Sequence, residues 1–351
     1  MGNVLRLKGL ANKELIQASR KCSLPLFLGI PLATGSVGKI CQLRCRYCFV
    51  EPKMPTGKIL TPNDYVRIIS QFYRIGGRYI KTAHEGEPLL DPNFVPLVNY
   101  ATFLGLYWTS FSNLVGMTPE LASHLYLRKV SLIGKLNSLN PDIQEALTGN
   151  TGHFAKEKWT EHEGFLIPIG LKQVIDAGFN KTFREPFTDD SEKRTRLGVD
   201  IVVTKLNLKG IPDVVEFCLL NDIYPDIETL EISGEAKKDL SALQITPEDS
   251  KWLSDRLLSI LGKEFLEEHK ALTTDFCPLF QVGIVYNADG TLRYCYVVPL
   301  ESKLTLANDL TIDIYRKLLR LKTERREQVL SSMGKQEGVL APCPNGIFAP
   351  L

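Results

Sequence analysis

Three cysteines within eight positions are the residues of this chain best suited to chemistry. Cys41, Cys45 and Cys48 stand in the stretch KICQLRCRYCFV, with no fourth cysteine nearby. A structural zinc site closes with four protein ligands, so the trio is one ligand short of such a site. A cubic iron–sulfur cluster fits the number better, because three cysteines hold three of its irons and the fourth iron is left to bind a substrate or cofactor. The spacing therefore predicts a cluster with one open coordination position, with zinc as the alternative.

Two further polar motifs come directly after predicted strands. EGEPLLDP at 85–92 follows a strand predicted at 79–83, and SNL at 112–114 follows a strand predicted at 106–111. Ligands of parallel α/β folds bind at the carboxyl ends of the strands. We therefore expect the cysteines and both motifs to line one pocket.

Helices and strands alternate between about 60 and 235, which predicts parallel strands covered by helices. The first helix begins at Thr61-Pro62-Asn63-Asp64, where a cap residue precedes a proline and an acid. Its apolar residues share one face: Tyr65, Ile68, Ile69, Phe72 and Tyr73. Further helices are predicted near 93–104, from 118, and near 164–177 and 211–220. Strands are predicted at 130–134, 199–204 and 228–232.

Two polar segments, 149–163 and 184–196, interrupt this alternation. They are interpreted as surface insertions at the ends of the sheet or as substrate lids. After 235 the pattern changes to a helix from Thr246-Pro247, a hairpin whose turn is Asn287-Ala288-Asp289-Gly290, and a helix near 311–322. These patterns predict an N-terminal extension at 1–24, a core at 25–235 and a small second domain at 236–351.

The cysteine spacing, C-x3-C-x2-C with Tyr47 before the last cysteine, resembles the signature of the radical S-adenosylmethionine (SAM) superfamily. EGEPLLDP resembles the Gly-Glu-Pro motif that follows the second strand of that family. Three later stretches resemble its third, fourth and fifth strand segments: SFSNLVGMTPELA, VSLIGKLNSLNPDIQEALTG and VDIVVTKLNLKGIPDVVEFC. The resemblance covers about residues 25–235 and implies an α/β fold, a partial (β/α)6 barrel followed by a small β-hairpin/helix domain.

The resemblance also implies a chemistry. SAM would chelate the open iron of a [4Fe-4S] cluster, and one electron would cleave its sulfonium to a 5′-deoxyadenosyl radical that abstracts hydrogen from the substrate. The electron would come from a donor of the flavodoxin or ferredoxin type. The implied cluster ligands are Cys41, Cys45 and Cys48. The implied cofactor-binding residues are Tyr47, Gly86, Glu87, Pro88, Ser112, Asn113, Lys135, Asn137 and Thr204.

Two residues depart from the family pattern. Glu85, preceded by His84, replaces the usual first glycine and is interpreted as a substrate contact or as a residue packed at the rim. Lys135 replaces the small or acidic residue common on the fourth strand. We expect it to pair with a substrate anion or with the cofactor carboxylate, or else to pack its stem and leave its head in solvent.

A second set of cysteines resembles the opening motif of SPASM and twitch domains. Cys277 and Cys295 flank the predicted hairpin around Gly290, and Cys343 is the third candidate ligand. The resemblance implies an auxiliary iron–sulfur cluster. Gly346 stands where a fourth cysteine is usual, so this cluster would have an open iron, a non-cysteine ligand or Cys22. Cys218 shares a helix face with apolar residues and is interpreted as a core thiol.

Three classes of function remain open. The first is an oxidoreductase, isomerase or lyase that acts on a sugar-like or cyclitol-like small molecule by dehydrogenation, epimerisation or dehydration, with Cys22 as a hydrogen donor if it epimerises. The second is a ribosomal peptide maturase that forms thioethers or carbon–carbon crosslinks or epimerises residues. Only about 24 residues precede the first predicted strand, which disfavours a leader-binding domain. The third is a non-catalytic metal scaffold.

The composition of the chain limits the partners and the cellular location that we expect. The formal net charge is +2 and the sequence pI is about 8.0, too balanced to indicate binding to nucleic acid or to a charged membrane surface. No apolar stretch reaches the roughly 20 residues needed to span a bilayer, and the N-terminus lacks the apolar core of a secretory signal. We expect a cytoplasmic protein, where eight cysteines are metal ligands or catalytic thiols rather than disulfides.

Overall fold

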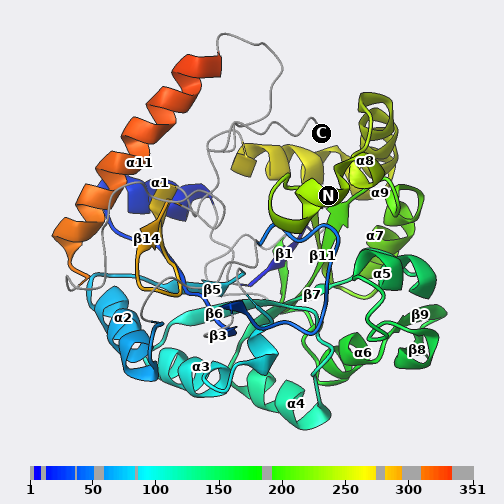
Figure 1. Cartoon of the computed structure of the whole chain (residues 1–351), viewed down its shortest axis with the longest axis horizontal. Helices are drawn as coiled ribbons and strands as arrows, with labels where there is room; N and C mark the ends of the chain where they lie inside the picture. Colours follow the sequence, from blue (N-terminus) through cyan, green and yellow to red (C-terminus); the bar gives the residue numbers. More distant parts are fainter. Residues whose placement is uncertain are drawn as a thin grey trace.

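A curved sheet whose strands are mostly parallel organises the chain (Figure 1). The structure is a computed structural model that describes residues 4–8, 13–35, 38–50, 59–83, 86–183, 192–273, 281–294 and 310–333. The parallel barrel strands are β2 (Phe27–Gly29), β5 (Tyr79–Thr82), β6 (Tyr107–Ser112), β7 (Ser131–Lys135), β11 (Leu197–Val203) and β12 (Tyr224–Thr229). They lie in the order β12-β11-β7-β6-β5-β2, so the predicted α/β fold with a partial (β/α)6 barrel is confirmed.

Helices cover the outer face of this sheet (Figure 1). They are α2 (Pro62–Arg74), α3 (Phe94–Phe103), α4 (Pro119–Leu127), α5 (Pro141–Leu147), α6 (Ile169–Asp176) and α7 (Ile211–Leu220). The side chains between the helices and the sheet form one large apolar core that includes Phe72, Trp108 and Phe217. The predicted buried face of α2 is confirmed except at Tyr73, which is 43% exposed near the end of the helix.

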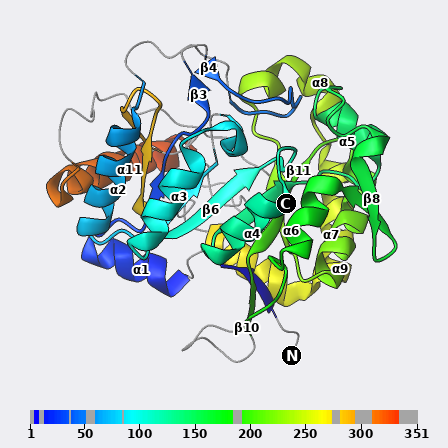
Figure 2. The same cartoon turned by 90° about the horizontal axis from the view of Figure 1, so that it is seen from below.

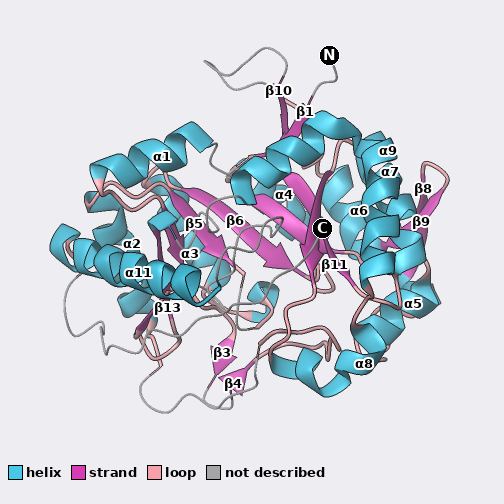
Figure 3. Cartoon of the chain, turned by 90° about the horizontal axis from the view of Figure 1, so that it is seen from above, coloured by secondary structure: helices cyan, strands magenta, loops and turns pink. Residues whose placement is uncertain are grey.

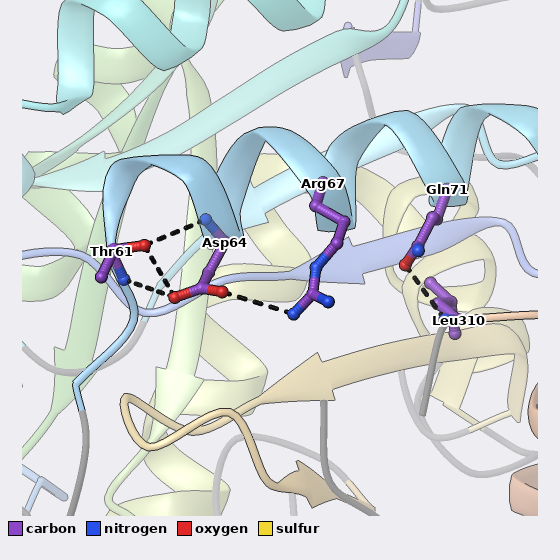
Figure 4. Close-up of polar contacts among 5 residues, drawn as sticks. All are labelled: Thr61, Asp64, Arg67, Gln71 and Leu310. Atoms are coloured by element: carbon purple, nitrogen blue, oxygen red, sulfur yellow. Dashed lines mark hydrogen bonds and ion pairs between the residues drawn. The ribbon is translucent and has the colours of Figure 1, made fainter. Parts of the chain in front are cut away.

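The start of α2 is fixed by its capping residues (Figure 4). Asp64 N donates to the Thr61 hydroxyl at 3.2 Å, and Thr61 N donates to the Asp64 carboxylate at 2.9 Å. This reciprocal pair satisfies two of the amide groups that a helix start leaves free. Further along α2, the Gln71 side chain accepts a hydrogen bond of 3.0 Å from Leu310 N, which ties the helix to the C-terminal part of the chain.

The C-terminal segments extend the barrel. The predicted hairpin is confirmed as β13 (Gly283–Tyr286) and β14 (Leu292–Arg293), and β13 pairs in parallel with β2. Helix α11 (Ile312–Met333) crosses this region, where Lys322 Nζ donates to the Gly283 carbonyl at 2.7 Å. After β12 the chain forms α8 (Leu240–Leu243) and α9 (Pro247–Thr273), which is interrupted at Gly262.

The N-terminal segment is more ordered than expected. A strand β1 (Val4–Leu7) and a helix α1 (Lys13–Cys22) precede β2, and neither was predicted. β1 pairs in parallel with β10 (Glu192–Thr195) at one end of the barrel. The short hairpin of β3 (Thr34–Gly35) and β4 (Gly38–Lys39) lies at the opposite end (Figures 2 and 3).

Both polar insertions differ from the expectation. Residues 159–168 form a hairpin of β8 (Trp159–His162) and β9 (Phe165–Pro168), so α6 begins only at 169. Trp159 and Phe154 are buried, and the Trp159 indole donates to the Phe154 carbonyl at 2.7 Å, so this segment is a packed element rather than a loose insertion. The described part of 184–196 forms β10 at the amino end of β11, away from the carboxyl ends of the strands, which contradicts a lid role for it. The remaining residues of that segment lie outside the described part of the chain.

No helix within the described residues is long and apolar enough to cross a membrane.

Candidate active site

A cavity opens at the carboxyl ends of the barrel strands, at the β3–β4 end shown in Figure 3. The loop 39–50 forms one side of it, and residues at or after the ends of β5, β6, β7, β11 and β12 form the rest. Among the residues predicted from sequence, the cavity is lined by Cys41, Cys45, Tyr47, Cys48, Gly86, Glu87, Pro88, Ser112, Asn113 and Lys135. The tertiary structure therefore brings together groups that lie almost 100 positions apart in the chain.

The cysteine loop is held by its own backbone. Arg44 N and Arg46 N each donate a 3.0 Å hydrogen bond to a carbonyl at the end of α5, those of Thr148 and Leu147. The Arg46 guanidinium also forms an ion pair with Asp239. The thiols are thus presented from a pinned loop rather than from a free one.

The segment η4 (Gly234–Asp239), which follows β12, closes over the last cysteine. Glu235 N donates to the Cys48 carbonyl at 2.8 Å, and Ser233 Oγ donates to the Phe49 carbonyl at 3.0 Å. Gly234 has a φ of 55°, and a Cβ there would lie 2.5 Å from the Phe49 carbonyl carbon. Only glycine fits this contact, because an added side-chain carbon would meet rigid backbone on the partner segment.

The Gly-Glu-Pro motif packs directly against the loop that leads to the cysteines. Gly86 N donates to the Leu32 carbonyl at 3.2 Å, and Glu87 N donates to the Ile40 carbonyl at 2.8 Å. A Cβ on Gly86 would lie 2.1 Å from the Ile40 carbonyl oxygen and 2.4 Å from that of Ala33. The glycine is therefore required by this close backbone approach.

The Glu87 carboxylate serves the fold. It accepts hydrogen bonds from Ser112 Oγ at 2.7 Å, Asn113 N at 2.7 Å and Leu89 N at 3.1 Å. Burial raises the pKa of Glu87, and these donors partly offset the rise. Glu87 and Ser112 therefore join the ends of β5 and β6. Both line the cavity, but most of their hydrogen-bonding groups are already paired within the protein.

Asn113 connects the end of β6 to the first cysteine. Its Oδ1 accepts from Gln42 Nε2 at 3.2 Å and from Val115 N at 2.9 Å, which orients the amide. Its Nδ2 then lies 4.0 Å from the Cys41 sulfur. Asn113 thus lies beside Cys41 in the pocket that both residues were predicted to line.

Tyr47 is buried, and its hydroxyl accepts a hydrogen bond of 2.8 Å from Asn137 Nδ2. Asn137 is fully buried, and its Oδ1 accepts a hydrogen bond of 2.8 Å from Val202 N. Thr204 is also fully buried, and both its amide and its hydroxyl donate to Asn207. Neither side chain lines the cavity, so the structure does not support the cofactor contacts predicted for Asn137 and Thr204, which stay predictions.

Charged residues form a row across three neighbouring strands. Lys135 on β7 is the register partner of Asp200 on β11, and Asp200 is the register partner of Asp226 on β12. Lys135 and Asp200 form an ion pair, and the Lys135 ammonium lies 5.4 Å from the centre of the Tyr47 ring. The ammonium of Lys135 is thus paired with Asp200 of the same chain, rather than left to bind a substrate anion or to extend into solvent. Glu228, two residues beyond Asp226, lines the cavity.

The acids of this row repel one another. Removal from bulk water and the charges of Asp200 and Asp226 raise the pKa of Glu228, while Lys135 and Lys81 oppose the rise; the result is a pKa of about 8. The same causes raise the pKa of Asp226 to about 6. Although Glu228 is more than one third exposed, its exposed surface faces the cavity, where the barrel walls displace much of the bulk water.

Other predicted residues lie elsewhere. Cys22 is exposed at the end of α1, before β2, and so at the amino end of the barrel strands. This position is at the other end of the barrel from the cavity, so the structure does not support Cys22 as a hydrogen donor there, and that role stays a prediction. Cys218 is fully buried on α7, which confirms the core thiol. Glu85, Cys277, Cys295 and Cys343 lie outside the described residues.

A family model described as the radical SAM superfamily matches residues 36–157, the stretch that contains the cysteine trio, the Gly-Glu-Pro motif and Asn113. The chain carries a radical SAM superfamily domain in this stretch. Proteins of this family use a [4Fe-4S] cluster and SAM, so the predicted cluster cofactor and SAM follow from this domain.

Curated relatives of this radical SAM protein have several activities. A GTP 3′,8-cyclase of Picosynechococcus sp. is 28% identical over 40% of this chain and 46% of its own length. A probable GTP 3′,8-cyclase of Methanocaldococcus jannaschii is 22% identical over 87% of this chain and 89% of its own. A PqqA peptide cyclase of Bradyrhizobium diazoefficiens is 32% identical over 62% of this chain and 51% of its own. The match thus covers about half the length of the first and third of these relatives.

Solved structures of radical SAM enzymes share the fold. Streptococcus suis SuiB bound to the precursor peptide SuiA aligns with a TM-score of 0.58 at 16% identity, covering 86% of this chain and 68% of that chain. Native anSMEcpe with bound AdoMet aligns with a TM-score of 0.57 at 14% identity, covering 86% of this chain and 82% of that chain. At these identities the likeness establishes the barrel and leaves the substrate open.

The residues of this radical SAM protein fit a cluster better than a single ion. No three Cys, His, Asp or Glu side chains within the described residues converge closely enough to hold one metal ion. A cube meets each thiol at a different iron and needs no such convergence. Burial raises the pKa of Cys41, and that of Cys45 to about 12, so both thiols must give up protons to bind iron. Cys41, Cys45 and Cys48 would hold the cluster at the cavity wall.

Three functional candidates were missed in the sequence. Lys39, two residues before the trio, lies 3.1 Å from the Cys48 sulfur, where burial lowers its pKa but the cysteines raise it more. Asp200 interrupts the buried apolar strand VDIVV, a break that is a usable signal because buried parallel strands are nearly all apolar. Glu228 gave no signal, since a glutamate near a strand end is common on surfaces.

Proposed function

We propose that this chain is a radical SAM enzyme that removes a hydrogen atom from a compact polar molecule, such as a sugar or cyclitol, and leads it to dehydrogenation, epimerisation or dehydration. The observation that carries the proposal is the shared cavity, in which the cysteine loop faces the charged ends of β7 and β12. When bound, the cluster and SAM supply the electron and the radical that this reaction needs. The protein's own residues bind, orient and shield the reacting groups.

Each wall of the cavity has a role in this proposal. Asn113 and the Gly86–Pro88 motif border the cysteines and would receive the methionyl end of SAM. Apolar side chains beside the trio, including Leu43, Phe111 and Val202, keep water away from the reacting carbon. Glu228 on the far wall has no direct ion-pair partner within the described residues and would accept hydrogen bonds from substrate hydroxyl or amine groups.

An auxiliary iron–sulfur cluster held by Cys277, Cys295 and Cys343 is part of the proposal. The hairpin β13–β14, which separates the first two of these cysteines in sequence, supports it. This cluster would accept the second electron of a dehydrogenation or would bind the substrate. Iron counting tests it: a Cys41/Cys45/Cys48 triple alanine variant should retain about four irons, and an iron-free variant would refute the second cluster.

Peptide modification is the second candidate. The 32% identity to a PqqA peptide cyclase and the fold shared with SuiB bound to a precursor peptide favour it. The alternatives separate by substrate: inspection of neighbouring genes for a short precursor peptide or for sugar-tailoring enzymes indicates which compounds to assay. For either substrate we propose a flavodoxin- or ferredoxin-type electron donor and a cytoplasmic enzyme.

Anaerobic turnover tests the proposed class. The purified protein is reconstituted with iron and sulfide, reduced with dithionite, and incubated with SAM. We expect 5′-deoxyadenosine by liquid chromatography and mass spectrometry, and none from the Cys41/Cys45/Cys48 triple alanine variant. Absence of 5′-deoxyadenosine from fully reconstituted wild-type protein would overturn the proposal and favour a non-catalytic scaffold.

A further inference from the structure

Each of the three thiols in the cavity has a different polar neighbour. An amide lies beside Cys41, where Asn113 Nδ2 is 4.0 Å from the sulfur. The phenol of Tyr47 acts on Cys45, where it opposes the rise in the pKa of that thiol. An ammonium serves Cys48, since Lys39 Nζ is 3.1 Å from its sulfur. Among the described residues, Lys39 is the cation that donates directly to a cysteine of the trio.

Local structure fixes the position of Lys39. It belongs to β4 and is the register partner of Thr34 in the short β3–β4 hairpin. The next residue, Ile40, donates its amide to the Ala33 carbonyl at 2.7 Å, which closes the hairpin against the Gly-Glu-Pro motif. Lys39 is half-buried and lines the cavity. Lys39, two positions before the first cysteine, therefore contacts the third, Cys48.

Lys135, the other lysine of this wall, is placed differently. Its ammonium forms an ion pair with Asp200, so the pair adds little net charge near the thiols. Among the residues that the structure describes, Lys39 forms no ion pair with a carboxylate, and its hydrogen bond goes to a sulfur. Within that part of the chain, the charge of Lys39 thus acts on the trio without a compensating ion pair.

We infer that Lys39 is a positioning residue that sets the reduction potential of the cluster held by Cys41, Cys45 and Cys48, through its charged hydrogen bond to the Cys48 sulfur. The inference rests on the proposed function. Reduction adds one negative charge beside this sulfur, and a nearby ammonium favours the state with more negative charge. Hydrogen bonds to cluster sulfurs and local charge are known determinants of such potentials, and charge-assisted hydrogen bonds are the stronger kind.

The test compares Lys39→Met, Lys39→Gln and Lys39→Arg with the wild type. Each protein is reconstituted anaerobically without SAM and titrated with dithionite and mediators, and the reduced cluster is followed by electron paramagnetic resonance. The Cys41/Cys45/Cys48 triple alanine variant gives the auxiliary signal to subtract. Lys172→Met, which removes a lysine from an exposed pair with Asp176 on α6, is the matched control for loss of one positive charge.

At a fixed solution potential we expect the ratio of reduced to oxidised cluster to be about tenfold lower in the Met and Gln variants, a shift of about 59 mV for one electron. Lys39→Arg and Lys172→Met should stay close to the wild type. Equal potentials in the wild type and both neutral variants would overturn the inference. So would failure of both neutral variants to take up iron while Lys39→Arg does, because the charge would then act on assembly. A wild type without a SAM-binding cluster would instead refute the proposed function itself.

Discussion

Lys135 and Asp200 are direct register partners on the neighbouring parallel strands β7 and β11, and their side chains form an ion pair inside the barrel. The Asp200 side chain is 1% exposed, whereas that of Lys135 is 23% exposed and reaches the cavity. Apart from this ion pair, neither carboxylate oxygen of Asp200 has a hydrogen-bond partner within the described residues. The pair therefore links two strands and fixes the position of the Lys135 ammonium at the cavity wall.

Removing Lys135 should destabilise the fold. Lys135→Met leaves Asp200 buried without a counter-charge, and breaking a buried pair in this way costs about 3–5 kcal/mol. Urea denaturation of the apoprotein measures the loss in the free energy of unfolding. The double variant Lys135→Met/Asp200→Asn should recover most of the loss because no uncompensated charge remains.

The exposed pair of Lys172 and Asp176 is the matched control for this experiment. Lys172→Met should change the free energy of unfolding by less than about 1 kcal/mol, as is usual for surface pairs. A Lys135→Met protein as stable as the Lys172→Met protein would contradict the structural role of the buried pair.

Gly86→Ala should separate the Gly-Glu-Pro motif from the cysteine loop. The added Cβ would lie 2.1 Å from the Ile40 carbonyl oxygen, so one of the two backbones must move. We expect a loss of about 1–3 kcal/mol in stability and a several-fold lower iron content after reconstitution. Gly116→Ala is the control, because its nearest neighbour would be Leu89 Cβ at 3.9 Å, an ordinary contact. Equal iron content in the two variants would argue against this account.

Tyr47→Phe should reveal the cost of an unpaired amide. Without the phenol, the buried Asn137 Nδ2 loses its 2.8 Å acceptor, and an unsatisfied buried donor costs about 1–3 kcal/mol. Thermal or urea unfolding of the apoprotein measures this loss. Tyr73→Phe removes an exposed hydroxyl from α2 and should leave stability within about 0.5 kcal/mol of the wild type. Identical unfolding curves for both variants would show that the Asn137 contact has no energetic weight.

Glu228 should make stability fall as pH rises. The pKa of this carboxyl is raised to about 8 in the folded chain, above its ordinary value of 4.5, so between these values the folded state holds a proton that the unfolded state has released. Stability contributed by the protonated form is therefore lost as pH rises toward 8 and beyond. Because the side chain is more than one third exposed, screening reduces the effect to about 1–2 kcal/mol.

Glu228→Gln should remove this part of the pH dependence. Urea midpoints measured at pH 5, 7 and 9 should converge for the two proteins at pH 5 and favour the variant at pH 9. If the wild type keeps the same advantage or deficit relative to the variant at all three values, Glu228 titrates normally and the electrostatic description of the row is wrong.

Local sequence signals predicted helices and turns well where a residue type strongly favours one position, such as a helix start or a tight turn. The cap at Thr61, the proline after it and the acid at Asp64 fixed the start of α2, and the Gly290 turn fixed the β13–β14 hairpin. The strand expected at 228–232 is instead β12 at 224–229, and a helix expected from 164 is preceded by the β8–β9 hairpin. The first error is a shifted boundary, because proline and aspartate at 225 and 226 are rare in strands. The second arose where a short apolar run fits a strand or a helix equally well.

The sequence by itself indicated the cofactors of this protein, because three thiols at this spacing and a Gly-Glu-Pro motif after a strand resemble the radical SAM signature. Only the tertiary structure decided which polar residues reach the cavity. Asn137 and Thr204 stand at strand ends like the true lining residues, yet their hydrogen bonds are spent on Tyr47, Val202 and Asn207. The reason is physical: a buried polar side chain must find partners within the fold, and those partners come from strands whose register the chain order does not reveal.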